Sequence, residues 1–214
     1  MLSVLIIASH QFDDENKSLL DINGVPVITR QLALAKSLPR IADIVVVIGY
    51  NGGQVYEKSG RHARVVENEL HYLSNTARSI ELGLRVIKTR GVLIINGPLL
   101  LNEAALKTII DKESLVWLCH KREHDVGVSV NNNKVLRFAF GLPYRWPGVM
   151  YLQGKELSLF RSIMKEEMWR RHFTHEVLNE IIERGGEFTA VHPIGGKMLD
   201  MACYKDVLEA RRTL

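Results

Sequence analysis

The chain has 214 residues, of which 46% are hydrophobic and 24% charged, as in an ordinary soluble globular protein with a sizeable core. Its net charge of +4 comes from interspersed basic and acidic residues, so it does not indicate a nucleic-acid partner. No apolar stretch reaches the roughly 20 residues of a membrane span, and the first apolar run lacks the flanks of a signal peptide. Cys119 and Cys203 lie far apart without metal-binding spacing. We expect one cytoplasmic domain over residues 1–214, with no membrane partner.

The first half of the chain alternates predicted strands and helices. Residues 3–8 form an apolar run that ends in a polar loop, and residues 41–48 are rich in β-branched side chains, which is typical of a strand covered on both faces. Helical spacing of apolar residues predicts a helix over 26–38. Further strands are expected at 63–66, 92–95 and 115–119, and further helices at 54–59, 75–88 (capped by Ser74 or Asn75) and 102–110. This alternation predicts an α/β fold with a mixed, mostly parallel sheet and helices on both faces.

The second half of the chain has a different pattern. Apolar runs at 126–130 and 135–138 flank an Asn-rich turn, which predicts a hairpin, and residues 149–152 resemble a short strand. We expect a small antiparallel region over about 126–152 that covers one side of a cleft. Helices are expected at 157–168, 175–184 and 201–212, with a strand at 188–192.

The loop after the first strand is the expected wall of a ligand site, because open α/β sheets bind ligands at the carboxyl ends of their strands. This loop, residues 9–18, contains His10 and Lys17. His10 could donate a hydrogen bond to a phosphate or stack on a ring, and a structural role is the alternative. Lys17 could neutralise a phosphate, and a solvated loop lysine is the alternative.

Four segments in chain order resemble nucleotidyltransferases of the sugar-phosphate and phosphocholine type. Residues 17–26 (KSLLDINGVP) resemble that family's Pro-Lys-x-Leu…Gly-x-Pro stretch, and residues 44–50 (IVVVIGY) resemble its second strand and Gly-Tyr turn. The third segment has Asn68, Tyr72, Asn75 and Ser79 at the spacing of an Asn-Pro…Tyr…Thr-Asn…Ser pattern. In the fourth, residues 199–200 (LD) precede residues 206–210 (DVLEA), as in the family's closing strand and helix.

This resemblance implies a GT-A-like fold and a reaction in which a nucleotide passes from a nucleoside triphosphate to a phosphorylated small molecule, with release of pyrophosphate. The family site holds the phosphates with a lysine and a Mg²⁺ ion. Lys17 then takes the catalytic lysine position. The nucleotide-binding positions implied are Ala8, Ser9, His10, Asn75, Ser79 and Gly97. For Asn75 the alternative role is helix capping, and for Ser79 it is packing. The oligomeric state stays open, with a homodimer as one alternative.

The chain departs from the family pattern where the phosphates and the metal should bind. Residues 9–16 contain neither the glycines nor the arginine of a Gly-x-Gly-x-Arg loop. Pro98 follows Gly97 where the family has an aspartate, and Ala202 stands at the second metal position. Asp200 lies two residues earlier, on the same face of a strand, and could serve as the metal ligand instead.

Other carboxylates and histidines are weaker candidates for metal ligands. Asp13, Asp14 and Glu15 could supply replacement ligands, although a solvated acidic loop is the alternative. His175 and Glu176 are neighbours that would point apart on a helix, so we expect a helix start capped by Thr174 and no metal site. The segment 138–147 (FAFGLPYRWP), which is rich in aromatic residues, glycine and proline, could form an acceptor lid or a dimer contact.

These departures leave two other hypotheses open. The chain could be a degenerate member that keeps the fold to bind a nucleotide, a nucleotide-sugar or a protein. It could also be an unrelated doubly wound domain.

Overall fold

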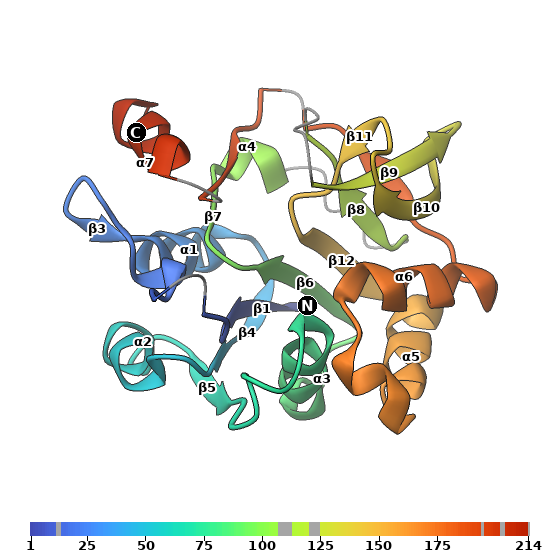
Figure 1. Cartoon of the computed structure of the whole chain (residues 1–214), viewed down its shortest axis with the longest axis horizontal. Coiled ribbons are helices and arrows are strands. Elements are labelled where there is room, and N and C mark those ends of the chain that lie inside the picture. The colour runs from blue at the N-terminus through green and yellow to red at the C-terminus, as the bar shows by residue number, and fades with distance from the viewer. Residues whose placement is uncertain (12–13, 107–112, 120–124, 194, 202–203, 214) are drawn as a thin grey trace.

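The computed structural model describes residues 1–11, 14–106, 113–119, 125–193, 195–201 and 204–213. Within them a ten-stranded sheet runs through the molecule in the order β11-β9-β10-β13-β8-β12-β6-β1-β4-β5 (Figure 1). The strands from the first half of the chain are parallel, with β1 pairing β4 on one side and β6 on the other. These strands are β1 (Leu2–Ala8), β4 (Ile41–Ile48), β5 (Arg64–Glu67) and β6 (Gly91–Asn96).

The second half of the chain extends the same sheet. β12 (Val149–Gln153) runs antiparallel between β6 and β8 (Leu115–Trp117), and β13 (Thr189–Val191) runs parallel to β8. The edge consists of β10 (Lys134–Phe140), β9 (Val126–Asn131) and β11 (Tyr144–Arg145), each antiparallel to its neighbour. Within this ten-stranded sheet of the described residues only β12, β10 and β11 oppose the common direction, so the prediction of a mixed, mostly parallel sheet is confirmed. The predicted antiparallel region in the second half is present, and its last strand, β12, lies in the middle of the sheet.

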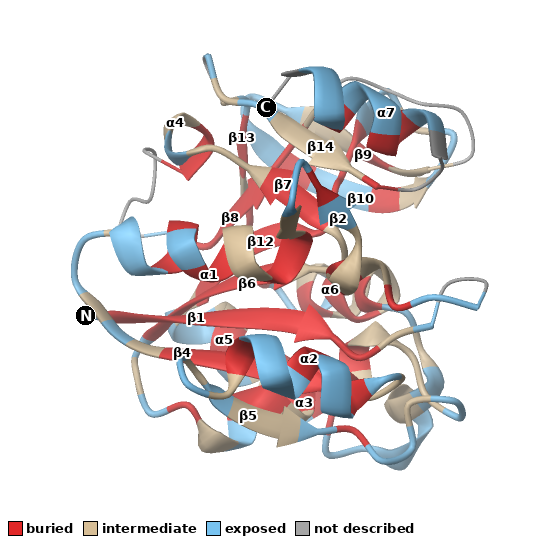
Figure 2. Ribbon diagram, turned by 90° about the vertical axis from the view of Figure 1, so that its left-hand side faces the viewer, coloured by how far each residue is buried: buried red, intermediate tan, exposed pale blue. Residues whose placement is uncertain are grey.

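Helices cover both faces of the sheet, as predicted. α1 (Val27–Ser37) and α2 (Gly52–Ser59) lie on one face, where α1 packs against β1 and β4, and α2 against β4. α3 (Thr76–Val86), α5 (Gly154–Ile163) and α6 (Thr174–Glu183) lie on the other, where α3 packs against β1, α5 against β12 and α6 against β10. Figure 2 shows the buried strands as a red layer between helices whose outer faces are pale blue. Because both faces of β1 are buried, its sequence is a continuous apolar run.

A third, smaller core gathers beside β6. β7 (Leu99–Leu101) pairs with β14 (Met198–Asp200), and the hairpin of β2 (Asp21–Ile22) and β3 (Val25–Pro26) packs near α7 (Tyr204–Thr213). The predicted turn at Gly24 is present, with a φ of 80°. The remaining helices are α4 (Glu103–Leu106) and two 3₁₀ helices, η1 (Lys17–Leu19) and η2 (Glu167–Arg171). Among the described residues, no helix is long and apolar enough to cross a membrane.

Three local predictions were wrong. The helix expected over 157–168 ends at Ile163, and η2 follows as a separate element. Asn75 precedes α3 but its side chain makes no cap; its amide donates to the Arg171 carbonyl at 2.6 Å. Thr174 is not the cap of α6 but its first residue, and the Glu176 carboxylate accepts from the Phe173 N–H instead. Residues 107–110, Asp13, Ala202 and Cys203 lie outside the described part of the chain.

Candidate functional site

A pocket of about 330 Å³ opens at the carboxyl ends of β1 and β6. The loop after β1 forms one wall, as predicted, and the turn after β6 forms the floor beside it. The start of α6 and the end of β11 complete the rim. Predicted residues that line the pocket are Ala8, His10, Lys17, Gly97 and Asp200. Ser9, Asn75 and Ser79 do not line it, although Thr76, next to Asn75, does.

Asn16 holds the loop in place. Its side-chain amide donates to the Ala8 carbonyl at 2.9 Å and to the Tyr50 carbonyl at 2.8 Å, while its oxygen accepts from the Ser18 N–H at 3.0 Å. Asn16 is only 3% exposed, so this side chain replaces water for several backbone groups at the end of β1. Lys17 follows directly at the start of η1, half-buried in the pocket wall. The position of Lys17 is thus set by its neighbour.

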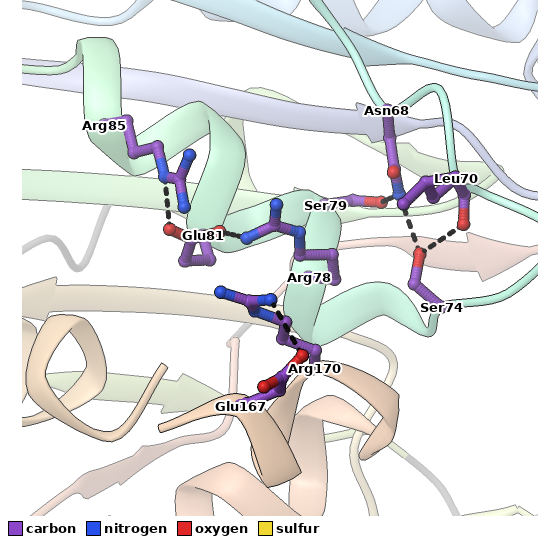
Figure 3. A network of polar contacts seen from close by, with 9 residues as sticks. All are labelled: Asn68, Leu70, Ser74, Arg78, Ser79, Glu81, Arg85, Glu167 and Arg170. Carbon is purple, nitrogen blue, oxygen red and sulfur yellow. Dashed lines mark hydrogen bonds and ion pairs between the residues drawn. The ribbon is translucent and has the colours of Figure 1, made fainter. Parts of the chain in front are cut away.

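Ser9, Ser79 and Asn68 form a buried polar row beneath the pocket. Ser9 Oγ lies 2.9 Å from His10 Nδ1 and 2.7 Å from Ser79 Oγ, and the Asn68 amide donates to Ser79 Oγ at 2.9 Å. Figure 3 shows the Asn68 end of this row at the first turn of α3. Ser9 and Ser79 are fully buried, so in this conformation they act on a ligand only through His10.

Burial lowers the pKa of His10 to about 4, and the nearby His71 adds to the effect. The imidazole is therefore neutral at pH 7.

The turn after β6 lines the pocket at Gly97, whose backbone groups are held by hydrogen bonds within the protein. Gly97 has a φ of 70°, its N–H donates to the Ile7 carbonyl at 3.1 Å, and its carbonyl accepts from the Gln31 amide at 2.9 Å. A residue with a side chain would be strained at this φ. Pro98 follows and has no N–H to offer a phosphate.

Asp200 reaches the pocket because β14 pairs with β7, which places Asp200 opposite Leu99. Its carboxylate accepts from Arg145 Nη2 at 2.6 Å. The same guanidinium forms an ion pair with Asp125, and only 5% of the Arg145 side chain is exposed. A buried arginine thus sits between two carboxylates at the pocket wall.

The described residues do not fit a magnesium site. Mg²⁺ needs oxygen ligands at about 2.0–2.1 Å in octahedral array. Asp200 is instead occupied by the Arg145 guanidinium, and Pro98 supplies no ligand. No group of three or more metal-binding side chains occurs among the residues that the structure describes.

Two parts of this site were missed in the sequence. Arg145 falls in the aromatic segment 138–147, where a single charged residue among apolar neighbours was the available signal. Asp125 follows a stretch of mixed charge, and its sequence context gave no such signal. Of that segment, Phe138 is buried in the core, Phe140 is 65% exposed, and Trp146 and Pro147 line the pocket.

An α/β sheet with a pocket at the carboxyl ends of its parallel strands belongs to the class of folds that bind ligands at this edge of the sheet. Residues 8–134, more than half of the chain, match the model of the MobA-like NTP transferase domain, and the chain belongs to this family. This confirms the resemblance to nucleotidyltransferases. No curated protein sequence matches significantly.

Solved structures share the fold over nearly the whole chain. An inositol-1-phosphate CTP transferase from T. maritima is 19% identical with a TM-score of 0.77, covering 98% of this chain and 94% of that one. The CTP:phosphocholine cytidylyltransferase LicC from Streptococcus pneumoniae is 15% identical with a TM-score of 0.79, covering 99% and 98%. A putative glucose-1-phosphate thymidylyltransferase from Bacillus anthracis is 16% identical with a TM-score of 0.79, covering 99% and 94%.

Proposed function

We propose that this protein transfers a nucleotide from a nucleoside triphosphate to a phosphorylated small molecule. A phosphate oxygen of the acceptor forms a bond to the α-phosphorus, the bond from that phosphorus to the bridging oxygen breaks, and pyrophosphate leaves. Membership of the NTP transferase family supports the donor. The names of the structural neighbours suggest inositol 1-phosphate, phosphocholine and glucose 1-phosphate as acceptors to test.

The observation that carries the proposal is the position of Lys17. It lies in the wall of the pocket at the end of β1, held by the hydrogen bonds of Asn16. Phosphoryl chemistry needs positive charge where negative charge accumulates, and a lysine supplies it as a compact point charge. Arg145 also lines the pocket, but its charge is balanced by Asp125 and Asp200. We assign Lys17 to the triphosphate because it lies in the pocket wall at the lysine position that the resemblance implies.

The test is pyrophosphate release from ATP, CTP, GTP or UTP, each paired with the three acceptors. The proposal predicts release with one pair, and a loss of at least about a hundredfold in Lys17→Ala, as for removal of a group that stabilises transition-state charge. Lys58→Ala is the matched control, because Lys58 is exposed on α2 outside the pocket. Undiminished release in Lys17→Ala would contradict the assignment.

A degenerate member that binds a nucleotide without turnover is the second candidate. The ion pair of Arg145 favours this candidate, because the guanidinium binds the Asp200 carboxylate, which the resemblance assigns to a metal. Every assay is therefore run with Mg²⁺ and with EDTA. Binding that is equal under both conditions, with no release for any pair, would select this candidate over the enzyme.

A further inference from the structure

The buried polar row ends at an unsatisfied donor or acceptor in the pocket. It runs from Asn68 through Ser79 and Ser9 to His10, with contacts of 2.9, 2.7 and 2.9 Å. His10 lines the pocket, and its Nε2 is buried with no hydrogen-bond partner among the described residues. A buried polar atom without a partner is destabilising, so a bound group that satisfies it would be favoured.

The direction of the hydrogens along the row follows from its far end. The Ser74 hydroxyl donates to the Leu70 carbonyl at 2.9 Å, and Ser74 Oγ accepts from the Asn68 amide at 3.1 Å (Figure 3). The other hydrogen of that amide goes to Ser79 Oγ. Ser79 Oγ therefore already accepts one hydrogen at the start of the row.

The Ser79 hydroxyl hydrogen has Ser9 Oγ as its acceptor among the described residues. Ser9, which accepts that hydrogen in this arrangement, has its own hydrogen to donate to His10 Nδ1, 2.9 Å from Ser9 Oγ. A neutral imidazole that accepts at Nδ1 carries its hydrogen on Nε2. The row thus favours the His10 tautomer with its hydrogen on Nε2.

We propose that His10 is a fixed, neutral donor that gives a hydrogen bond from Nε2 to an oxygen of the bound nucleotide. The acceptor is a phosphate oxygen or a carbonyl oxygen of the base. This role rests on the proposed function and assigns Ser9, Ser79 and Asn68 as positioning residues. It also gives Ser79, expected to contact the nucleotide, an indirect role.

Two different features set the charge of His10 and the ring nitrogen that carries its hydrogen. The depressed pKa of His10 keeps it uncharged near neutrality, with His71 as the titratable neighbour that acts on it. Lys17 supplies charge to the same pocket, whereas a neutral N–H supplies direction, since a hydrogen bond weakens steeply away from linearity.

The first test reads the tautomer directly in the ligand-free protein. Imidazole ¹⁵N shifts are recorded at pH 7, and His10→Gln identifies the His10 signals. We expect protonation at Nε2 alone in the wild type, and a mixture with the Nδ1–H form in Ser9→Ala. A wild-type His10 protonated at Nδ1, or at both nitrogens, would overturn the proposal.

The second test measures binding of ATP, CTP, GTP, UTP and inorganic pyrophosphate by calorimetry. His10→Leu removes the donor, and we expect about tenfold weaker nucleotide binding, as for one lost hydrogen bond. His10→Gln places an amide N–H near the same point and should stay within about threefold of the wild type. Unchanged affinity in His10→Leu would contradict the proposal, with circular dichroism confirming that both variants are folded.

Pyrophosphate distinguishes the two acceptors. A phosphate acceptor predicts weaker pyrophosphate binding in His10→Leu, and a base carbonyl predicts a loss for the nucleotide alone. If the wild type binds none of the four nucleotides, the proposed function and the nucleotide role of His10 are both wrong, while the ¹⁵N shifts still decide the tautomer.

Discussion

Arg145 illustrates how the surroundings of one residue set its role. Its guanidinium is almost fully buried and lies between Asp125 and Asp200, whose side chains are 28% and 24% exposed. Removing the partners of a buried charge leaves desolvation uncompensated. The main role of Arg145 is therefore structural: it holds Asp125 and Asp200 at the wall of a pocket where a metal was expected.

A mutant cycle tests this role of Arg145. We expect Asp125→Asn/Asp200→Asn to lower the free energy of unfolding by about 3 kcal/mol, because the guanidinium stays buried without a charged partner. In an Arg145→Met background the same pair of substitutions should cost less than about 1 kcal/mol. Urea denaturation at pH 7 measures both differences. Equal costs in the two backgrounds would show that the ion pairs contribute nothing.

His10 should make stability depend on pH. Its folded-state pKa is lowered to about 4 from an ordinary value of 6.5, so the unfolded chain binds more protons between these values. The contribution is fully present above pH 6.5 and is lost as the pH falls toward 4. We expect the difference in unfolding free energy between wild type and His10→Gln to shrink by up to about 3 kcal/mol over this range. A difference that is constant with pH would place His10 in a more solvated site.

At the scale of elements, α3 contributes Ser79 to the polar row because it packs close to the sheet. A Cβ on Gly83 would overlap Leu5 Cδ1 of β1 and lie 3.0 Å from Val47 Cγ2 of β4. The glycine is thus required by the approach of the helix, and this approach brings Ser79 within hydrogen-bonding distance of Ser9.

Two glycine substitutions with opposite expected signs test this packing. Gly83→Ala should destabilise the fold by about 1–2 kcal/mol, because overpacking outweighs the gain in helix propensity. Gly53→Ala, in α2, meets nothing within 4 Å and should stabilise by up to about 1 kcal/mol. Thermal and urea unfolding report both changes. A stabilised Gly83→Ala would mean that Leu5 moves aside at little cost.

At the scale of the whole molecule, the sequence predicted the elements better than their partners. The strand expected over 41–48 is β4 itself, because a β-branched run buried on both faces is a local signal. The place of β12 in the centre of the sheet is set by pairing with β6 and β8, which no local pattern reveals.

The site divides in the same way. Lys17 and Gly97, both predicted site residues, line the pocket because they lie in the segments that follow predicted strands. Arg145 and Asp200 meet across 55 positions, and Ser9 and Ser79 across 70, so each contact depends on the completed fold. Spacing and residue type therefore could not predict that Ser79 is buried or that the Asp200 carboxylate pairs with Arg145.

The central claim is that the pocket at the ends of β1 and β6 binds a nucleoside triphosphate. The most direct measurement is the thermal stability of the wild type and Lys17→Ala with ATP, CTP, GTP or UTP, each with Mg²⁺ and with EDTA. A nucleotide at about 100 times its dissociation constant should stabilise the wild type by about 2.7 kcal/mol. We predict such a shift for at least one nucleotide and a smaller one in Lys17→Ala. Unchanged melting temperatures with all four nucleotides would contradict the account.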